Sequence, residues 1–382
     1  KILIISNMYL HYVLLIMICI PVLLFIWFKI RNPFWSKQPV FNYYNIYYWI
    51  YPNRIINDYL PEINKYYNVK NIVSKNYRDV TFSEKIEMMS LLQTHYYKKK
   101  YIQYKPLSSN VFPYFENQVD NSYISLFYKN KKMVGLISGR PLTVNLNNSS
   151  FITYYVDFLC VHSDHRKQNI APELIQTHYY NECYKQPSIL TCLFKKESHL
   201  NNFVPLIVYN TYTFNMKNWI TYELHSCVNI ININSKNIHI LVDFIRNNKH
   251  KYKCFITCSI SNLLKLIETG NIYVYCVIIN KKVYASYFFR NTSTIYFNKK
   301  SIECFGTIQD CSDLLFIYAF SNIAYYFKEN YLFITIEDIS NSSAIIENIV
   351  KKHKYLYDTK TAFYFYNYAT YPLKKEEYLC IY

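Results

Sequence analysis

Glycine is scarce in this sequence, with only four glycines among 382 residues. The glycine-rich phosphate-binding loops are therefore excluded, because neither G-x-G-x-x-G nor G-x-x-x-x-G-K-[ST] can be written with them. Acidic residues are also few: 25 Asp and Glu stand against 42 Lys and Arg, which gives a net charge of +17. Such a balance usually indicates a polyanionic partner. No nucleic-acid-binding motif accompanies the scattered lysines, so we expect no nucleic-acid partner.

Cysteine pairing motifs are missing as well. The eleven cysteines are scattered, and no C-x-x-C occurs. This pattern predicts reduced thiols, with neither a disulfide framework nor a zinc site. The histidines show no metal-ligand or triad spacing, so no metal is expected. What the chain does have is apolar and aromatic residues, at 51% and 19%, which is enough for a sizeable core and excludes wholesale disorder.

The N-terminal segment lacks charge. Residues 2–28 contain no Asp, Glu, Lys or Arg, and Met8–Phe28 is 21 residues long, enough to cross a hydrocarbon core of about 30 Å as a helix. A secretory signal peptide and a buried core helix are the alternatives, although no small-residue cleavage site follows. We predict a transmembrane anchor over residues 1–29. Lys29, Arg31 and Lys37 then place the following domain in the cytosol, which makes the chain a single-pass membrane protein.

The rest of the chain mixes strands and helices in an order that occurs twice: helix, antiparallel strands, helix, strand. Thr81–Glu84 has the cap-then-carboxylate pattern of a helix start. Further helices are predicted at 171–184, 313–327 and 342–352, and strands include 122–128, 132–138, 153–162, 219–224 and 362–368. This order predicts an α+β fold with a mostly antiparallel sheet.

The segment Asp157–Ile175 is the most informative for chemistry. It is an apolar strand, then a polar loop with Arg166 and Lys167, then a helix start. A helix N-terminus offers free N–H groups and a positive dipole end to a phosphate. The residues alone leave two interpretations open: a pyrophosphate site without glycine, or an ordinary connection with a solvated basic turn.

Four motifs in this sequence resemble those of the eukaryotic N-myristoyltransferase family. Phe158-Leu159-Cys160-Val161-His162, a basic loop and Ala171-Pro172-Glu173-Leu174-Ile175 resemble its signature. The family's other motifs are similar to Phe34–Val40, Met133–Ser138 and Tyr364–Tyr368. Their order and spacing fit over residues 34–382.

The resemblance implies a fold and an activity. The fold would be two acetyltransferase-like (GNAT) halves related by a pseudo-two-fold axis around a saddle-shaped sheet. Residues 30–214 would bind the acyl-CoA and residues 215–382 the peptide. The activity would be transfer of a myristoyl group from myristoyl-CoA, a substrate and not a resident cofactor, to the N-terminal glycine amine of a protein. A monomer is expected.

The same resemblance implies roles for individual residues. The backbone N–H groups of Phe158 and Leu159 would form the oxyanion hole, because the thioester oxygen gains negative charge as the amine attacks. The terminal carboxylate of Tyr382 would be the base that deprotonates the amine. The acyl-CoA would be bound by Phe34, Trp35, Cys160, Val161, Arg166, Lys167, Gln168, Asn169, Ile170 and Ala171.

The chain departs from the family at several positions. Asp157 stands where the family has Asn, Asn169 replaces a basic residue, and Asp358 has lost both flanking glycines. Lys98, Lys99 and Lys100 replace an acidic loop along the peptide groove, so we expect the family's preference for a basic downstream residue to be lost or reversed. The expected peptide-binding residues are Asp157, Lys98, Lys99, Lys100 and Asp358.

These departures keep two alternatives to an active transferase open. One is a catalytically degenerate member that binds acyl-CoA or a lipidated peptide. The other is a structural membrane protein that only shares the fold.

Overall fold

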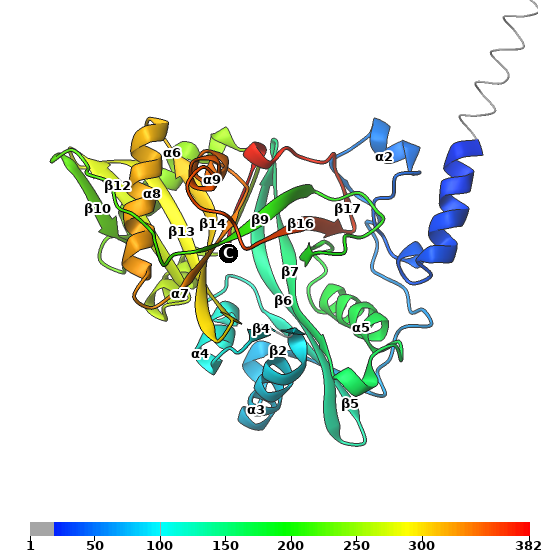
Figure 1. Ribbon diagram of the computed structural model, residues 1–382. Helices are drawn as coiled ribbons and strands as arrows, with labels where there is room; N and C mark the ends of the chain where they lie inside the picture. The colour runs from blue at the N-terminus through cyan, green and yellow to red at the C-terminus, as the bar shows by residue number, and fades with distance from the viewer. Residues whose placement is uncertain (1–18, 100) are drawn as a thin grey trace, which may run out of the picture.

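Figure 1 shows a computed structural model of the chain, of which residues 19–99 and 101–382 are described. The strands up to residue 215 are β1 (Arg54–Ile55), β2 (Ile72–Asn76), β3 (Lys98–Lys99), β4 (Ile102–Tyr104), β5 (Tyr123–Lys129), β6 (Lys132–Leu146), β7 (Ser149–Val161), β8 (Cys192–Glu197) and β9 (Ile207–Asn215). The later strands are β10 (Val228–Asn232), β11 (Cys254–Thr257), β12 (Ile272–Ile279), β13 (Lys282–Tyr296), β14 (Lys299–Gln309), β15 (Phe333–Glu337), β16 (Tyr357–Tyr366), β17 (Tyr368–Ala369) and β18 (Tyr378–Ile381).

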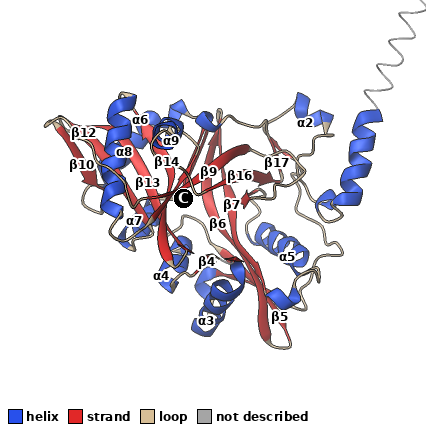
Figure 2. Cartoon of the chain, viewed as in Figure 1, coloured by secondary structure: helices blue, strands red, loops and turns tan. Residues whose placement is uncertain are grey.

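Helices flank these strands (Figure 2). They are α2 (Ile46–Ile50), α3 (Phe82–Leu91), α4 (Ser108–Val111), α5 (Ile170–Lys185), α6 (Ile238–Asn248), α7 (Ile260–Glu268), α8 (Asp313–Phe327) and α9 (Ser342–Val350), and a further helix covers residues 19–31.

Within the described part of the chain, sixteen strands belong to one sheet. Its main path runs β10-β12-β13-β14-β15-β9-β16-β8-β7-β6-β11-β18. Most neighbours are antiparallel; the parallel pairs are β7 with β8, β14 with β15 and β11 with β18. The predicted α+β fold with a large, mostly antiparallel sheet is confirmed. Strands from the second half of the chain lie next to strands from the first half: β16 is next to β8, and β11 is next to β6.

The local patterns explain several elements. The α3 helix begins with the expected capping box, in which Thr81 Oγ1 accepts from the Glu84 N–H and Glu84 Oε2 accepts from the Thr81 N–H. The α5 and α8 helices lie within one residue of their predicted limits. The strand predicted at 219–224 is wrong. Trp219 is instead a buried anchor of an irregular segment, and its Nε1 donates to the carbonyl oxygen of Ser321.

The predicted membrane anchor is corrected by the structure. Among residues 19–99 and 101–382, none of the helices combines the length and the apolar character that crossing a bilayer requires. This finding overturns the single-pass membrane localisation and the membrane as a partner. The end of the 19–31 helix packs against the rest of the protein, because Phe28 is buried and the Phe25 and Phe28 rings contact Tyr44. The first part of the expected span, residues 8–18, lies outside the described residues.

A buried hydrogen bond connects α5 to the sheet. His178 Nε2 lies 2.9 Å from Glu182 Oε1, and His178 Nδ1 shares a 2.8 Å hydrogen bond with Ser125 Oγ on β5. The pair lies directly over Gly139 of β6, where a Cβ atom would meet Glu182 Oε1 at 2.0 Å. The backbone of β6 can approach α5 this closely only because position 139 carries no side chain.

We therefore expect Gly139→Ala to destabilise the fold by about 1–3 kcal/mol, the usual cost of overpacking a filled core. The matched control is Gly135→Ala on the same strand, whose Cβ would meet the end of the flexible Leu174 side chain at 3.0 Å. Urea unfolding measures both variants. Equal losses in the two variants would contradict the special fit at Gly139.

Candidate active site

A cavity of about 1040 Å³ lies between the first and second halves of the chain. It is lined by six of the residues expected at the site from sequence: Trp35, Asp157, Phe158, Leu159, Asp358 and Tyr382. The structure thus brings together residues that are far apart in the sequence. Phe34, Cys160, Val161 and residues 166–171, which were also expected at the site, do not line this cavity.

A β-bulge shapes the centre of this cavity. Leu136 of β6 pairs with Cys160 of β7, but the next pair is Ser138 with Asp157, so Phe158 and Leu159 together oppose a single residue. Phe158 adopts a left-handed φ of 50°, which is uncommon for a bulky residue. The bulge therefore interrupts the regular pairing of β6 with β7 at Phe158 and Leu159, two residues that line the cavity.

Asp157 already occupies one of these donors. Its Oδ1 accepts a 2.8 Å hydrogen bond from the Phe158 N–H, while its carbonyl oxygen accepts from Ser138 Oγ at 3.0 Å. A carboxylate makes a stronger acceptor than a neutral amide. The replacement of the family's Asn by Asp thus places a negative charge on the very donor that the resemblance assigns to the oxyanion.

Aromatic packing fixes the bulge from behind. The buried Phe158 ring contacts the rings of Tyr96, Tyr104 and Phe115, whereas the Leu159 side chain is 37% exposed. The next residue, Cys160, points into this core, and burial raises the pKa of its thiol to about 12. Cys160 is therefore a thiol at neutral pH and a poor nucleophile.

The basic loop lies beyond the end of β7. Arg166 Nη2 donates to the carbonyl oxygen of His95 at 2.5 Å, and Lys167 and Asn169 have left-handed φ values of 64° and 62°. Residues 166–169 are exposed, whereas the Ile170 side chain is buried against Leu174. The loop thus presents exposed polar side chains and the start of α5, as the resemblance requires of a phosphate-binding segment.

The two neighbouring aromatic residues Phe34 and Trp35 make different contacts. Trp35 lines the cavity and stacks on Phe194 with ring centroids 5.9 Å apart. Phe34 packs behind it against Tyr66. Of the expected lysines, Lys98 and Lys99 form the β3 strand paired with β4, and Lys100 lies outside the described residues.

Tyr382 is buried directly after β18, the last strand of the sheet path. The β18 strand before it runs parallel to β11, and the Ile381 carbonyl oxygen accepts from the Cys258 N–H at 3.0 Å. The Tyr382 ring is buried 4.7 Å from that of Tyr155 and lies between two guanidinium groups, Arg140 at 5.4 Å and Arg290 at 4.9 Å. Burial raises the pKa of its phenol.

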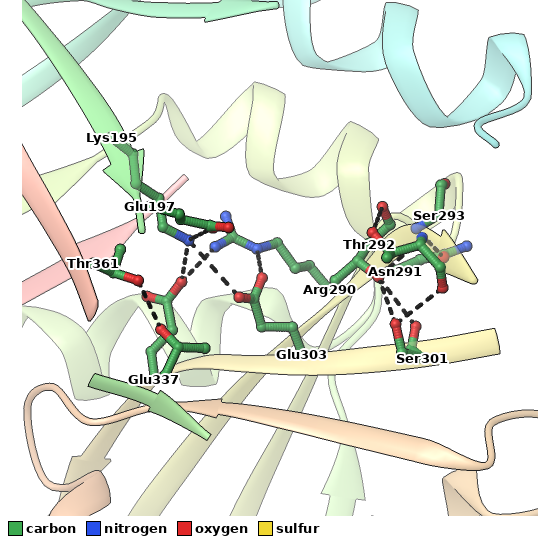
Figure 3. Close-up of polar contacts among 12 residues, drawn as sticks. Lys195, Glu197, Arg290, Asn291, Thr292, Ser293, Ser301, Glu303, Glu337 and Thr361 are labelled. Carbon is green, nitrogen blue, oxygen red and sulfur yellow. Dashed lines mark hydrogen bonds and ion pairs between the residues drawn. The ribbon is translucent and has the colours of Figure 1, made fainter. Parts of the chain in front are cut away.

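A cluster of four buried or partly buried charged residues was not predicted from the sequence, and the more exposed Glu197 adds a further contact to it, 3.3 Å from Lys195 Nζ (Figure 3). Lys195 Nζ lies 2.5 Å from Glu337 Oε1 and 3.8 Å from Glu303 Oε1. Arg290 Nη2 lies 2.9 Å from Glu337 Oε1, and Arg290 Nε donates to Glu303 Oε2. The only local signal is an isolated charge within or at the end of an apolar stretch, as at Arg290 after Phe288-Phe289 and at Glu337 after Ile334-Thr335-Ile336.

The pKa values of the two carboxyl groups in this cluster are shifted in opposite directions. Burial raises the pKa of Glu337 to about 7, although Lys195 and Arg290 act to lower it. Burial also acts to raise the pKa of Glu303, but Arg290 and Lys195 lower it to about 2. The four groups form a nearly neutral set that links strands of both halves. No group of three or more potential ligands for a metal ion occurs among the residues the structure describes.

Comparisons with known proteins agree with the resemblance. Residues 63–193 match the family model of the myristoyl-CoA:protein N-myristoyltransferase N-terminal domain. The "Putative glycylpeptide N-tetradecanoyltransferase" of Amsacta moorei entomopoxvirus is 25% identical over 215 residues, which cover 53% of this chain and 71% of the relative.

The fold is also that of solved structures. A crystal structure of Saccharomyces cerevisiae N-myristoyltransferase with bound myristoyl-CoA is similar with a TM-score of 0.72 at 12% identity, over 90% of this chain and 94% of that one. Another, with bound myristoyl-CoA and inhibitors, has a TM-score of 0.74 at 12% identity, over 93% and 94% of the two chains.

Removing one member of the charge cluster should strongly destabilise the protein. Lys195→Met leaves Glu303 and Glu337 with one cation, and breaking a buried ion pair in this way costs about 3–5 kcal/mol. The neighbouring Lys196→Met is the control, since Lys196 Nζ donates to the neutral amide of Asn201. The free energy of unfolding in urea measures both. The double variant Lys195→Met/Glu337→Leu should recover part of the loss, and a full additive loss would contradict the coupling.

Proposed function

Because this chain belongs to the N-myristoyltransferase family, we propose that it transfers a myristoyl group from myristoyl-CoA to the N-terminal glycine amine of a protein. The observation that carries the proposal is the β-bulge at Phe158 and Leu159, which interrupts the strand pairing beside a cavity large enough for a ligand. We assign the backbone N–H groups of these two residues as donors to the substrate. The reaction needs donors of this kind where the thioester oxygen becomes an oxyanion, and each is worth about 3 kcal/mol.

The proposed reaction needs one attack and two proton movements. The glycine nitrogen forms a bond to the thioester carbon, the carbon–sulfur bond breaks, and CoA leaves as a thiolate. The proton that the nitrogen loses as it becomes an amide goes to this thiolate. An α-amine has a reference pKa of about 7.7–8.0 and is mostly protonated at neutral pH, so a base must first remove a proton. We assign this role to the main-chain carboxylate of Tyr382, because Tyr382 is buried and lines the same cavity as Phe158 and Leu159.

The donor and the acceptor are assigned to different ends of the site. The exposed loop Arg166–Asn169, the backbone of Cys160, Val161, Ile170 and Ala171, and the aromatic pair Phe34 and Trp35 would hold the acyl-CoA. The acceptor peptide would approach past Asp157, Asp358 and the segment Lys98–Lys100.

We further propose that the chain consists of two acetyltransferase-like halves, residues 30–214 and 215–382, related by a pseudo-two-fold axis, and that it acts as a monomer. Two matching runs support this division. In the first, β5, β6 and β7 are antiparallel, α5 follows, and β8 is parallel to β7. In the second, β12, β13 and β14 are antiparallel, α8 follows, and β15 is parallel to β14.

The direct test supplies myristoyl-CoA and a synthetic peptide and follows release of the free CoA thiol. A peptide with an N-terminal glycine should become acylated, and the same peptide with its amine acetylated should not. The alternative, a member that binds acyl-CoA without transfer, is favoured by one observation, the Asp157 carboxylate on the Phe158 N–H. Tight binding of myristoyl-CoA with no thiol release from any glycine peptide would support that alternative.

We expect Asp157→Asn to raise kcat by about threefold to tenfold. A neutral amide competes less well for the Phe158 N–H than a carboxylate does, and it removes a negative charge beside the developing oxyanion. The control is Asp243→Asn on the exposed face of α6, which makes the same change in net charge far from the cavity. Steady-state kinetics measure both. A fall in kcat would mean that the carboxylate serves the incoming ammonium instead.

Extension of the chain beyond Tyr382 should suppress transfer while leaving myristoyl-CoA binding unchanged. Added residues convert the carboxylate into an amide, which cannot accept the proton, whereas the proposed acyl-CoA loop lies elsewhere. The measurement is single-turnover acyl transfer beside equilibrium binding of myristoyl-CoA. An extended protein that transfers at the original rate would exclude the Tyr382 carboxylate as the base.

A further inference from the structure

Arg140 is a buried cation that none of the roles above uses. It lies on β6, is only 1% exposed and lines the cavity. Its Nε and Nη1 atoms are buried without a hydrogen-bond partner among the described residues. A guanidinium group carries five N–H donors, so this side chain enters the cavity wall with unused hydrogen-bonding capacity.

The contrast with Arg290 shows how unusual this is. Arg290 lines the same cavity, but its donors are used by Glu303 and Glu337 (Figure 3). The Arg140 Cζ lies 5.0 to 5.4 Å from the centroids of three aromatic rings, those of Tyr114, Tyr155 and Tyr382. Cation–π contacts offset part of the desolvation cost of a buried charge, but they leave the N–H donors unsatisfied. A buried, unpaired charge is among the costliest features a fold can carry.

The position of Arg140 indicates which ligand reaches it. Arg140 pairs with Tyr155, and Ser138 pairs with Asp157, so Arg140 and Asp157 lie on one face of the sheet, one diagonal step apart. The Tyr382 ring lies on this face as well. The acyl-CoA loop begins at Arg166, beyond the end of β7, and the six residue steps from Tyr155 to Val161 span about 20 Å. Arg140 thus belongs to the acceptor end of the cavity.

We propose that Arg140 binds the carboxylate of an acidic side chain at the second or third residue of the acceptor peptide. A planar guanidinium group matches a carboxylate with two parallel hydrogen bonds. An extended peptide advances about 3.3 Å per residue, so only a side chain near the N-terminal glycine lies within reach of a group this close to Asp157. This inference rests on the proposed transfer and deepens it by naming a feature of the acceptor.

The experiment compares matched peptides that carry Asp or Asn at the second or at the third position after an N-terminal glycine. The wild-type protein should favour Asp at one of the two positions by about tenfold in kcat/KM. Arg140→Met should abolish that preference while still transferring to the Asn peptides. The control, Arg246→Met on α6, removes an exposed arginine and should keep the preference.

A second readout separates this role from a structural one. Because Arg140 is unpaired in the free protein, Arg140→Met should raise the Tm of the unliganded protein by about 2 °C. A structural cation would give a fall in Tm on the same change. Arg140→Lys keeps the charge without the planar guanidinium group, so it should show a weakened preference for Asp. This variant replaces Arg140→Met in the test if the Met variant does not fold.

Each remaining outcome decides the proposal. An Asp preference that persists in Arg140→Met would overturn it and assign the preference to other cations such as Lys98–Lys100. An equal loss of kcat for every peptide would also overturn it and place Arg140 in support of Tyr382. If no peptide is acylated, calorimetric binding of the same peptides is compared. An Asp preference lost in Arg140→Met then upholds the Arg140 site while the proposed transfer fails.

Discussion

The bulge in the β6–β7 pairing is the constraint on which the site depends. Two residues of β7 face one residue of β6, and Phe158 must adopt a left-handed backbone conformation to make this possible. Such a conformation costs an L-residue roughly 1–2 kcal/mol, and it persists because the Phe158 ring is packed among three aromatic rings. The apolar core behind the strand thus keeps the backbone N–H groups beside the cavity in place. Asp157 and Leu159 take their positions from this distortion, whereas Tyr382 reaches the same cavity from the end of β18.

Charge inside the cavity is arranged differently from charge on the surface. The chain has a large excess of cations, yet the cavity wall holds the nearly balanced set Lys195, Arg290, Glu303 and Glu337. This set lies on strands of both halves and fixes their side chains against one another. Arg140 stands apart from it, because it lies against three aromatic rings and its Nε and Nη1 have no hydrogen-bond partner among residues 19–99 and 101–382. The difference is what marks Arg140 as a place for a ligand.

The sequence was most informative where local patterns decide the structure. The capping box of α3, the limits of α5 and α8 and the signature around Phe158 could all be found from neighbouring residues. The charge cluster could not, because Lys195, Arg290, Glu303 and Glu337 meet only through the order of strands in the sheet. The contact of Asp157 with the Phe158 N–H depends on a bulge that no spacing reveals. The anchor prediction failed for a related reason, since hydropathy does not show that Phe25 and Phe28 pack against Tyr44.

The strand order has a consequence for how the chain could be divided or recombined. β8, β7 and β6 come from the first half of the chain, but β16 borders them on one side and β11 on the other, and both belong to the second half. A fragment that ends near residue 214 would therefore expose an unpaired strand edge beside β6, and β8 would lose its neighbour β16. Open edges of this length are templates for aggregation. The two halves resemble each other in the order of their elements, yet neither is a module that can be exchanged without the other.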